Sequence, residues 1–200
     1  MLKGLLGDLV ENLKRLPGVG TKSAERIAMY LISDNKKVAL QLSESIKLCI
    51  ENYKNCTICN MLTDEDPCRF CTSSSRNDKV LCIVENTQDV YLIEDTHEFK
   101  GKFFVLGKLL SPLDGIGPDQ IKFPQLKALI DTGDIEEVIL ALNPSAEGES
   151  TMNFLGTQLG KQVSKITRLS TGLPFGGDIE YTSSLTLSNA LKRRYSINDE

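Results

Sequence analysis

The sequence lacks any apolar run long enough to span a membrane, and its leucine-rich start is interrupted by Asp8 and Glu11. A transmembrane helix needs about 20 consecutive apolar residues, and a signal peptide needs an unbroken apolar stretch. We therefore expect a cytoplasmic protein with no membrane partner.

A nucleotide-binding P-loop and a histidine cluster are also missing. No stretch matches G-x4-G-K-[ST], the Walker A pattern that cradles phosphates, so we expect no ATP hydrolysis by this chain alone. His97 is the one histidine and lies in the polar stretch EDTHEFKG, which is typical of a surface position rather than of a catalytic base. The lack of a Walker A loop argues against a P-loop ATPase, and the single histidine argues against histidine-based catalysis.

The formal net charge is only −4, but the charges are distributed unequally. Residues 1–55 contain nine Lys/Arg and six Asp/Glu, whereas residues 56–200 contain 14 and 21. A basic segment on an acidic chain allows local binding of nucleic acid. A solvated helical face explains the same small difference.

Hydrophobic periodicity predicts an α/β protein built of several parts. Apolar residues at steps of three and four predict helices over 2–14, 21–33 and 36–51. The third helix places an apolar set on one face: Val38, Leu42, Ile46, Cys49 and Ile50. After the polar hinge 73–78, we expect short buried strands at 80–84, 102–107, 137–142 and 165–170. Helices are expected at 87–95, 123–132, 149–160 and 183–194.

Alternating strands and helices imply a mainly parallel sheet with helices on both faces. The expected domains are a helical region over 1–55, a cysteine segment over 56–71, the sheet domain over 79–175 and a C-terminal segment over 176–200.

The stretch LPGVGTKSAERIA joins the first two helices through a tight Gly-x-Gly turn, Gly18 and Gly20. These glycines let backbone N–H groups approach an anion, and the positive dipole end of the next helix faces the same point. Lys22 and Arg26 are four residues apart and share one helical face. The pattern resembles the helix-hairpin-helix motif and predicts sequence-independent contact with DNA phosphates. A helical hairpin with glycine caps is the alternative.

Four of the six cysteines form the pattern Cys-x2-Cys-x8-Cys-x2-Cys: Cys56, Cys59, Cys68 and Cys71. Four soft anionic ligands suit a tetrahedral Zn²⁺, and a closed set of four leaves no position for water. We therefore expect a structural zinc site; a redox dithiol pair and an iron–sulfur cluster are the alternatives. Cys49 and Cys82 are predicted to be small buried hydrophobes.

Three glutamates follow two of the predicted strands: Glu85 after 80–84, and Glu147 and Glu149 after 137–142. If these strands are neighbours, the carboxylates converge at the carboxyl edge of the sheet, where ligands of open α/β sheets bind. This arrangement resembles the Toprim domain of topoisomerases and bacterial primases, in which acidic groups hold Mg²⁺. Here the later pair is Glu-Gly-Glu rather than Asp-x-Asp, and we find no tyrosine nucleophile in a topoisomerase-like context. A weakly held Mg²⁺, a partner site and favourable acidity at a helix N-terminus all rank ahead of catalysis.

The ordered set of motifs resembles the bacterial RecR recombination-mediator family over nearly the whole chain. The strings are LKRLPGVGTKSAERIA, CTICNM…PCRFC, IVENTQDVYLIE, LSPLDGIGPD, NPSAEGEST and GLPFGGDIEYTSSLTLSNAL. Two strings, FFVLGK and TSS, depart from the family pattern at positions that carry none of the motifs. The segment GLPFGGDIEY resembles the Walker-B-like element of that family.

The resemblance implies a role in DNA repair without catalysis. Members of the family act with RecO and RecF to load RecA on single-stranded DNA coated by single-strand-binding protein. They form rings that encircle DNA through contacts at both ends of the chain, so a homo-oligomer, dimer or tetramer, is expected. The alternatives are a Mg²⁺-dependent Toprim nuclease or primase-like enzyme and a zinc-stabilised scaffold that binds only protein.

Overall fold

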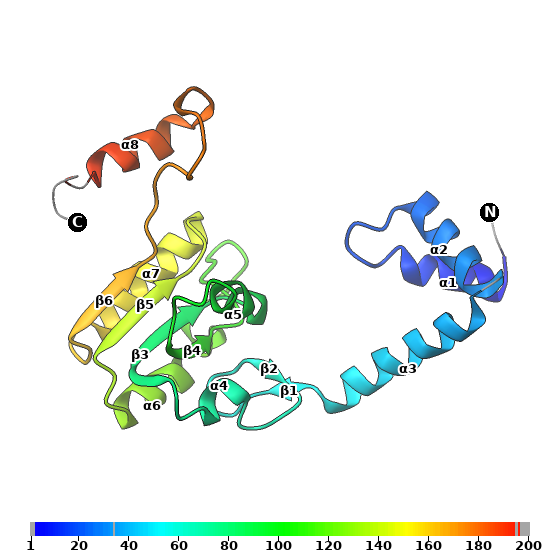
Figure 1. Ribbon diagram of the computed structural model, residues 1–200, viewed down its shortest axis with the longest axis horizontal. Helices are drawn as coiled ribbons and strands as arrows, with labels where there is room; N and C mark the ends of the chain where they lie inside the picture. The colour runs from blue at the N-terminus through cyan, green and yellow to red at the C-terminus, as the bar shows by residue number, and fades with distance from the viewer. Residues whose placement is uncertain (1–2, 34, 195, 197–200) are drawn as a thin grey trace. The chain divides into compact units, whose positions relative to one another are not determined.

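The computed structural model describes residues 3–33, 35–194 and 196, and the chain divides into two compact units, Met1–Tyr53 and Lys54–Glu200. Figure 1 shows the helices of the first unit and the mixed helices and strands of the second. Among the residues described, no helix combines the length and the apolarity that crossing a membrane requires.

The first unit consists of three helices, α1 (Leu5–Leu13), α2 (Thr21–Ser33) and α3 (Lys36–Asn52), at the places that the apolar spacing predicted. Val10 of α1 packs against Ala24 and Ala28 of α2, with four partly buried side chains around them: Leu6, Leu9, Leu13 and Val19. Two alanines facing one valine allow the helices to approach closely. Residue 2, the predicted start of the first helix, lies outside the described residues.

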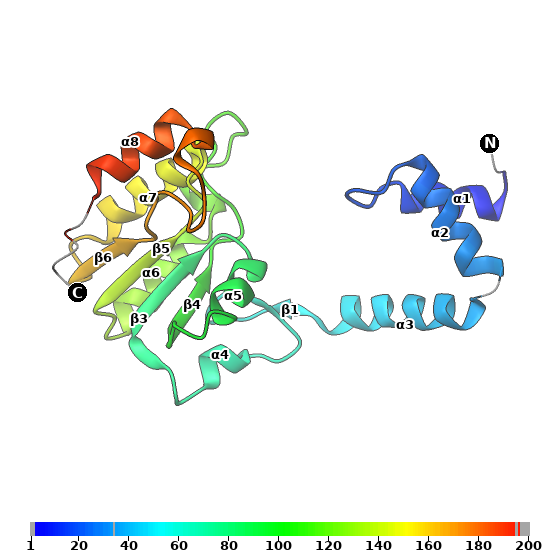
Figure 2. The ribbon, with the colours of Figure 1, turned by 45° about the horizontal axis from the view of Figure 1, so that its top comes forward.

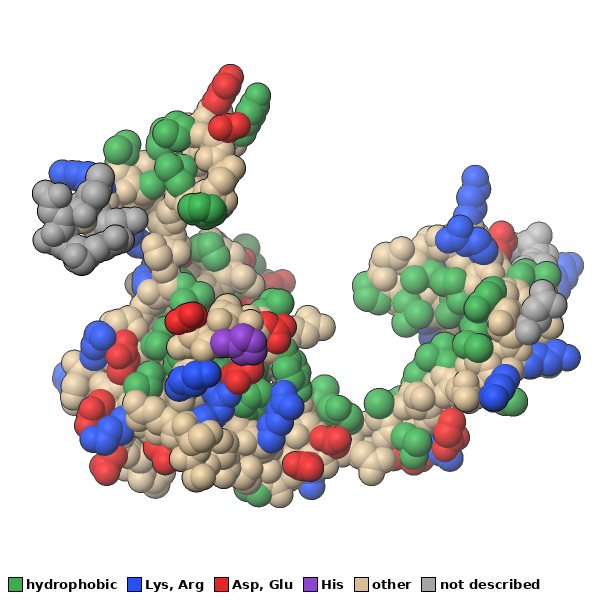
Figure 3. All heavy atoms as spheres, in the orientation of Figure 1, with side chains coloured by type: hydrophobic (Ala, Val, Ile, Leu, Met, Phe, Trp, Pro, Cys, Tyr) green, Lys and Arg blue, Asp and Glu red, His purple; other side chains and the backbone are tan. Residues whose placement is uncertain are grey.

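Helix α3 buries none of its side chains, although its sequence has a clear apolar face. The exposed large apolar side chains of α3 are Val38, Leu40, Leu42, Ile46, Leu48 and Ile50. Cys49 is exposed as well, so the prediction that it is a buried hydrophobe is wrong within a single chain. Apolar side chains gather on the visible face of the first unit in Figure 3.

The second unit is built on a four-stranded, fully parallel sheet in the order β4-β3-β5-β6. Its strands are β3 (Asn77–Val84), β4 (Gly101–Val105), β5 (Glu137–Ala141) and β6 (Lys165–Arg168). The connecting helices are α5 (Thr87–Glu94), α6 (Phe123–Thr132) and α7 (Ala146–Leu159), and η1 (Pro118–Gln120) precedes α6. The predicted α/β class is therefore confirmed.

Helix α7 begins three residues earlier than the predicted start at 149, because Ser145 caps it. The side-chain oxygen of Ser145 accepts a hydrogen bond from the Gly148 N–H at 3.1 Å, which satisfies one of the free donors of the first turn. As a result, Glu147 and Glu149 lie inside the first turn of α7 instead of in a loop before it.

The two faces of the sheet bury different sets of side chains, as the alternation of β-strands requires. Leu81 and Ile83 of β3 face α6 and α7, together with Phe104 of β4 and Leu140 of β5. The opposite face carries a second set under α5: Cys82, Val84, Phe103, Val105 and Ala141. Figure 2 shows α6 and α7 on one side of the sheet and α5 on the other. Cys82 is buried as predicted, and burial raises the pKa of its thiol to about 12.

The remaining short elements lie at the two ends of this unit. The cysteine segment contributes β1 (Lys54–Asn55), its antiparallel partner β2 (Leu62–Thr63) and α4 (Arg69–Thr72). After β6, the chain forms η2 (Ile179–Tyr181) and α8 (Ser184–Lys192), close to the predicted helix at 183–194.

Candidate functional sites

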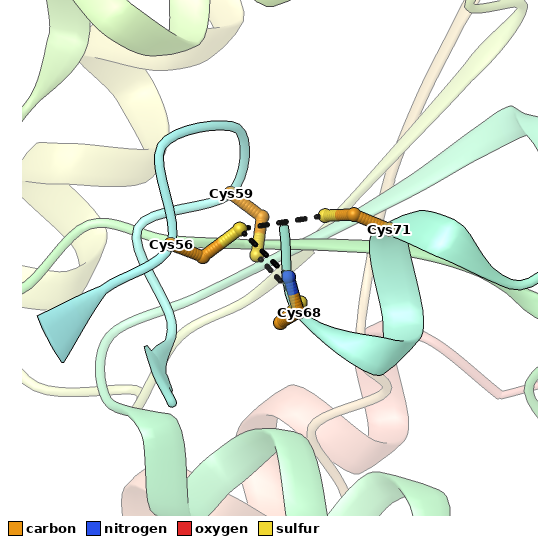
Figure 4. A group of neighbouring side chains, drawn as sticks. All are labelled: Cys56, Cys59, Cys68 and Cys71. Atoms are coloured by element: carbon orange, nitrogen blue, oxygen red, sulfur yellow. Dashed lines mark hydrogen bonds between the residues drawn. The ribbon is translucent and has the colours of Figure 1, made fainter. Parts of the chain in front are cut away.

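The four cysteines of the sequence motif come together at one point (Figure 4). Their Sγ atoms all lie within 4.8 Å of one another, and Cys56, Cys59 and Cys68 are buried while Cys71 is partly exposed. Cys56 Sγ is 3.9 Å from Cys71 Sγ, and Cys59 Sγ is 3.5 Å from Cys68 Sγ. A tetrahedral Zn²⁺ with Zn–S bonds of about 2.3 Å separates its sulfurs by about 3.8 Å. The donor set therefore fits zinc, in a closed site of structural type.

Hydrogen bonds among Cys59, Cys68 and Cys71 shift the pKa values of these three thiols in different directions. Hydrogen bonds from Cys59 and Cys71 lower the pKa of the Cys68 thiol well below its usual range, which favours its thiolate form. The hydrogen bond to Cys68 raises the pKa of Cys59, and hydrogen bonds to Cys59 and Cys68 raise the pKa of Cys71. Binding of Zn²⁺ displaces the remaining protons, so the affinity for zinc decreases as the pH falls.

The segment from β1 to α4, residues 54–72, is called the zinc knuckle below. One residue of its acidic loop, Asp66, forms hydrogen bonds within the knuckle. The Asp66 carboxylate accepts hydrogen bonds from the Thr57 N–H at 2.9 Å and the Thr57 hydroxyl at 3.0 Å. The hydrogen bond from the Thr57 N–H is the main cause of the lowered pKa of Asp66. Asp66 therefore ties the second half of the loop to the first Cys-x2-Cys turn.

The knuckle is attached to the edge strand β4 by main-chain and side-chain hydrogen bonds. The Val105 N–H donates to the Cys59 carbonyl at 2.9 Å, and the buried Asn60 amide donates to the Val105 carbonyl at 2.7 Å. Lys102 donates to three carbonyls at the end of α4: Phe70, Cys71 and Ser73. The knuckle also shares the α5-side core of the sheet, where the Phe70 and Phe103 rings meet edge to face at 5.5 Å.

The helix-hairpin-helix segment places its basic residues on the outside of α2. Ala24 and Ala28 are fully buried against α1, whereas Lys22 and Arg26 lie on the exposed side. The turn depends on Gly18, whose φ of 77° is unfavourable for any side chain. Gly20 accepts the first backbone hydrogen bond of α2, from Ala24 at 2.9 Å, and has open space around it. The predicted phosphate-binding residues are therefore accessible, and they lie together in the hairpin turn and the first part of α2.

The three glutamates lie at the carboxyl edge of the sheet but do not form one cluster. Strands β3 and β5 are neighbours, with Val84 opposite Ala141, so Glu85 and the start of α7 share this edge. In the described part of the chain, only the four cysteines form a group of three or more Cys, His, Asp or Glu side chains whose ligand atoms all lie within 4.8 Å of one another. Glu147 is exposed, and both oxygens of Glu149 accept hydrogen bonds from Arg168, at 2.9 and 2.6 Å. This arrangement does not fit a three-carboxylate magnesium site.

A close backbone approach explains the glycine between the two acidic residues. A Cβ atom at Gly148 would lie 1.9 Å from the Asn143 carbonyl oxygen, so no other residue fits without a shift of the backbone. Because they are two residues apart on a helix, Glu147 and Glu149 lie on different sides of the first turn of α7.

Three family profiles match the chain in the order of its segments. The RecR helix-hairpin-helix matches residues 6–49, the RecR four-cysteine zinc finger domain matches 54–73, and the Toprim domain matches 79–170. The chain is 41% identical to the recombination protein RecR of Francisella philomiragia over 94% of each chain. It is 40% identical to the protein of that name from Thermobifida fusca, over 98% of this chain and 99% of the relative. For the Nocardioides protein of that name the identity is 41% over 100% of both chains.

The chain belongs to the RecR family. The resemblance inferred from the ordered motifs is thus confirmed, and so is the structural zinc site, since the RecR zinc-finger profile covers all four clustered cysteines. The roles proposed for Lys22, Arg26 and the three glutamates stay predictions.

Two residues of these sites have no clear signal in the sequence. Arg168 ends β6 and forms the ion pair with Glu149 from 19 residues further along the chain. Asn60 has a φ of 62° and fastens the knuckle to β4. A basic residue at the last position of a strand, and an asparagine directly after a Cys-x2-Cys pair, are the only hints that the sequence offers.

Proposed function

We propose that this protein is a DNA-binding recombination mediator of DNA repair that works without catalysis. It acts with RecO and RecF to load RecA on single-stranded DNA, as a ring of two or four copies that encircles the DNA. Membership of the RecR family supports the recombination role, since the relatives carry the name recombination protein.

The observation that supports DNA binding most directly is the hairpin at Gly18 and Gly20. It exposes Lys22 and Arg26 beside the N-terminus of α2, where free backbone N–H groups and the helix dipole favour a phosphate. Such contacts reach the DNA backbone without reading base sequence. Residues Gly18, Gly20, Lys22 and Arg26 form the proposed DNA-binding site.

We assign the acidic edge of the sheet to a protein partner, RecO, rather than to catalysis. Glu147 is exposed and Glu85 is partly exposed, so both can contact a basic partner, whereas Glu149 is engaged by Arg168. The nuclease or primase-like alternative needs carboxylates that gather around Mg²⁺, and the described residues do not offer such a set.

Exchange of both Lys22 and Arg26 for alanine tests the proposed DNA contact. Binding to single- and double-stranded DNA is measured by fluorescence anisotropy at several salt concentrations. We expect weaker binding, and a log–log salt slope that is less steep by about two for each subunit in contact with DNA, because two phosphate contacts are lost.

The matched control exchanges Lys36 and Lys37, two exposed lysines at the start of α3, for alanine. The control should retain most of the affinity and of the salt slope. Equal losses in both double variants would show that net charge, rather than the hairpin, determines binding.

A further inference from the structure

Arg168 and Glu149 form a two-pronged ion pair at the carboxyl edge of the sheet. Arg168 is the last residue of β6 and lies opposite Leu140 of β5. Its Nη1 donates to one Glu149 oxygen at 2.9 Å and its Nη2 donates to the other at 2.6 Å. Both oxygens of the carboxylate are therefore occupied by one guanidinium group.

The backbone fixes both ends of this ion pair. Glu149 is held in the first turn of α7 by the Ser145 cap and by the close approach of Gly148 to Asn143. Arg168 is held by strand pairing and only 29% of its side chain is exposed. Hydrogen bonding by Arg168 is the main cause of the lowered pKa of Glu149, and the nearby charge of Arg193 acts in the same direction. Glu149 thus stays ionised, and its negative charge is balanced by the guanidinium of Arg168.

Burial does not keep a metal ion away from Glu149, because this residue lies beside an open cavity. It lines a cavity of about 680 Å³ together with Ser145, Thr171, Asn189 and Arg193. Octahedral Mg²⁺ needs free carboxylate oxygens, and a guanidinium in direct contact with the carboxylate repels a dication. A metal ion that entered this cavity would meet the positive charges of Arg168 and Arg193 beside Glu149.

We propose that the Arg168 guanidinium takes the place of a divalent cation in this Toprim sheet, and that it prevents Mg²⁺ from binding at Glu149. The guanidinium of Arg168 then balances the charge of Glu149 permanently, and the acidic edge serves as a rigid surface for a protein partner instead of a metal site. This inference deepens the role proposed for the acidic edge and is independent of the DNA contact at Lys22 and Arg26.

Titration of the zinc-loaded, full-length protein with MgCl₂ in a calorimeter tests the proposal. The wild-type protein should show no saturable Mg²⁺ site that depends on Glu149. Arg168→Gln should gain one site per chain, with an affinity at least about tenfold above any wild-type binding. The double variant Arg168→Gln with Glu149→Gln should lose that site again.

Lys165→Gln provides the matched control, because Lys165 also lies on β6 and its ion pair is with Glu137. It removes the same charge from the same strand and should gain no Mg²⁺ site. A Mg²⁺ site in the wild-type protein that disappears in Glu149→Gln would overturn the proposal. So would a folded Arg168→Gln that gains no Mg²⁺ site, or a Lys165→Gln that gains as much. Arg168→Met replaces Arg168→Gln if the latter does not fold, and the wild-type titration is decisive in either case.

Discussion

At the scale of single residues, the zinc knuckle depends on Asn60 as much as on its cysteines. The Asn60 amide is buried and donates to the Val105 carbonyl, while its side-chain oxygen accepts a hydrogen bond from Asn55 at 2.8 Å. Both groups of the amide are thus used, one toward the sheet and one within the knuckle. Loss of the side chain leaves a buried carbonyl of β4 without its partner, which is more costly than the net value of a hydrogen bond.

We expect Asn60→Gly to lower the free energy of unfolding of the sheet unit by about 1–3 kcal/mol. Glycine tolerates the left-handed backbone at this position, so this change removes the hydrogen bonds without adding backbone strain. Asn60→Ala should cost about 1 kcal/mol more, because alanine disfavours a positive φ. Chemical denaturation of the zinc-loaded protein measures both values.

Asn153→Ala is the control, since Asn153 is an exposed position in α7. It should change the stability by no more than about 0.5 kcal/mol. If Asn60→Gly behaved like this control, the knuckle would not be fastened to the sheet through Asn60.

At the scale of elements, the sequence of α3 predicts a buried apolar face, but the structure leaves that face exposed. Its apolar face was predicted from the spacing of Val38, Leu42 and Ile46, yet all three side chains are exposed in the single chain. An exposed apolar stripe of this kind is typical of a surface that another chain covers. We therefore assign α3 to the contact between copies in the proposed ring.

Replacement of both Leu42 and Ile46 by glutamate should dissociate this contact. Burial of each such side chain contributes about 1.5–3 kcal/mol, so the dissociation constant of the oligomer should rise about a hundredfold or more. Sedimentation velocity over a range of protein concentrations measures the change.

Glu44→Gln serves as the control, because Glu44 is exposed and lies two residues from both Leu42 and Ile46, on the other side of the helix. It should sediment as the unchanged protein does. An oligomer that persists in the Leu42 and Ile46 double variant would show that α3 is not the contact.

At the scale of the whole molecule, the chain separates a basic helical unit from an acidic sheet unit. Residues 1–55 carry an excess of positive charge and residues 56–200 an excess of negative charge. Charge of one sign gathered at one edge increases the rate of encounter with an oppositely charged partner. The division favours DNA on the first unit and a basic protein surface on the second.

Replacement of both Glu85 and Glu147 by glutamine should weaken the binding of RecO about tenfold at low salt, and less at physiological salt, because salt screens exposed charges. Surface plasmon resonance with immobilised RecO measures the affinity. DNA binding should be unaffected, since the hairpin belongs to the other unit.

Glu98→Gln tests whether the position of the charge matters. Glu98 is exposed and precedes β4, so it lies toward the amino edge of the sheet rather than the carboxyl edge. It should leave RecO binding unchanged. Equal weakening by this variant would mean that overall acidity, and not the carboxyl edge, attracts RecO.

The sequence by itself determined the parts of this protein that depend on local spacing. Apolar residues at steps of three and four located the helices, and short apolar runs located the strands of the sheet within a few residues. The cysteine spacing specified the zinc site, because each Cys-x2-Cys turn brings two sulfurs to one side of the chain. The order of these parts was enough to indicate the family.

Only the tertiary structure decided which distant groups meet. The pairing of β5 with β6 brings Arg168 to Glu149, and the attachment of the knuckle to β4 brings Asn60 to Val105. Neither contact follows from spacing along the chain, because each one depends on strand order and on the direction of a side chain from its backbone. The same geometry pairs Glu149 with Arg168, so that only two of the three strand-end glutamates lie outside this ion pair.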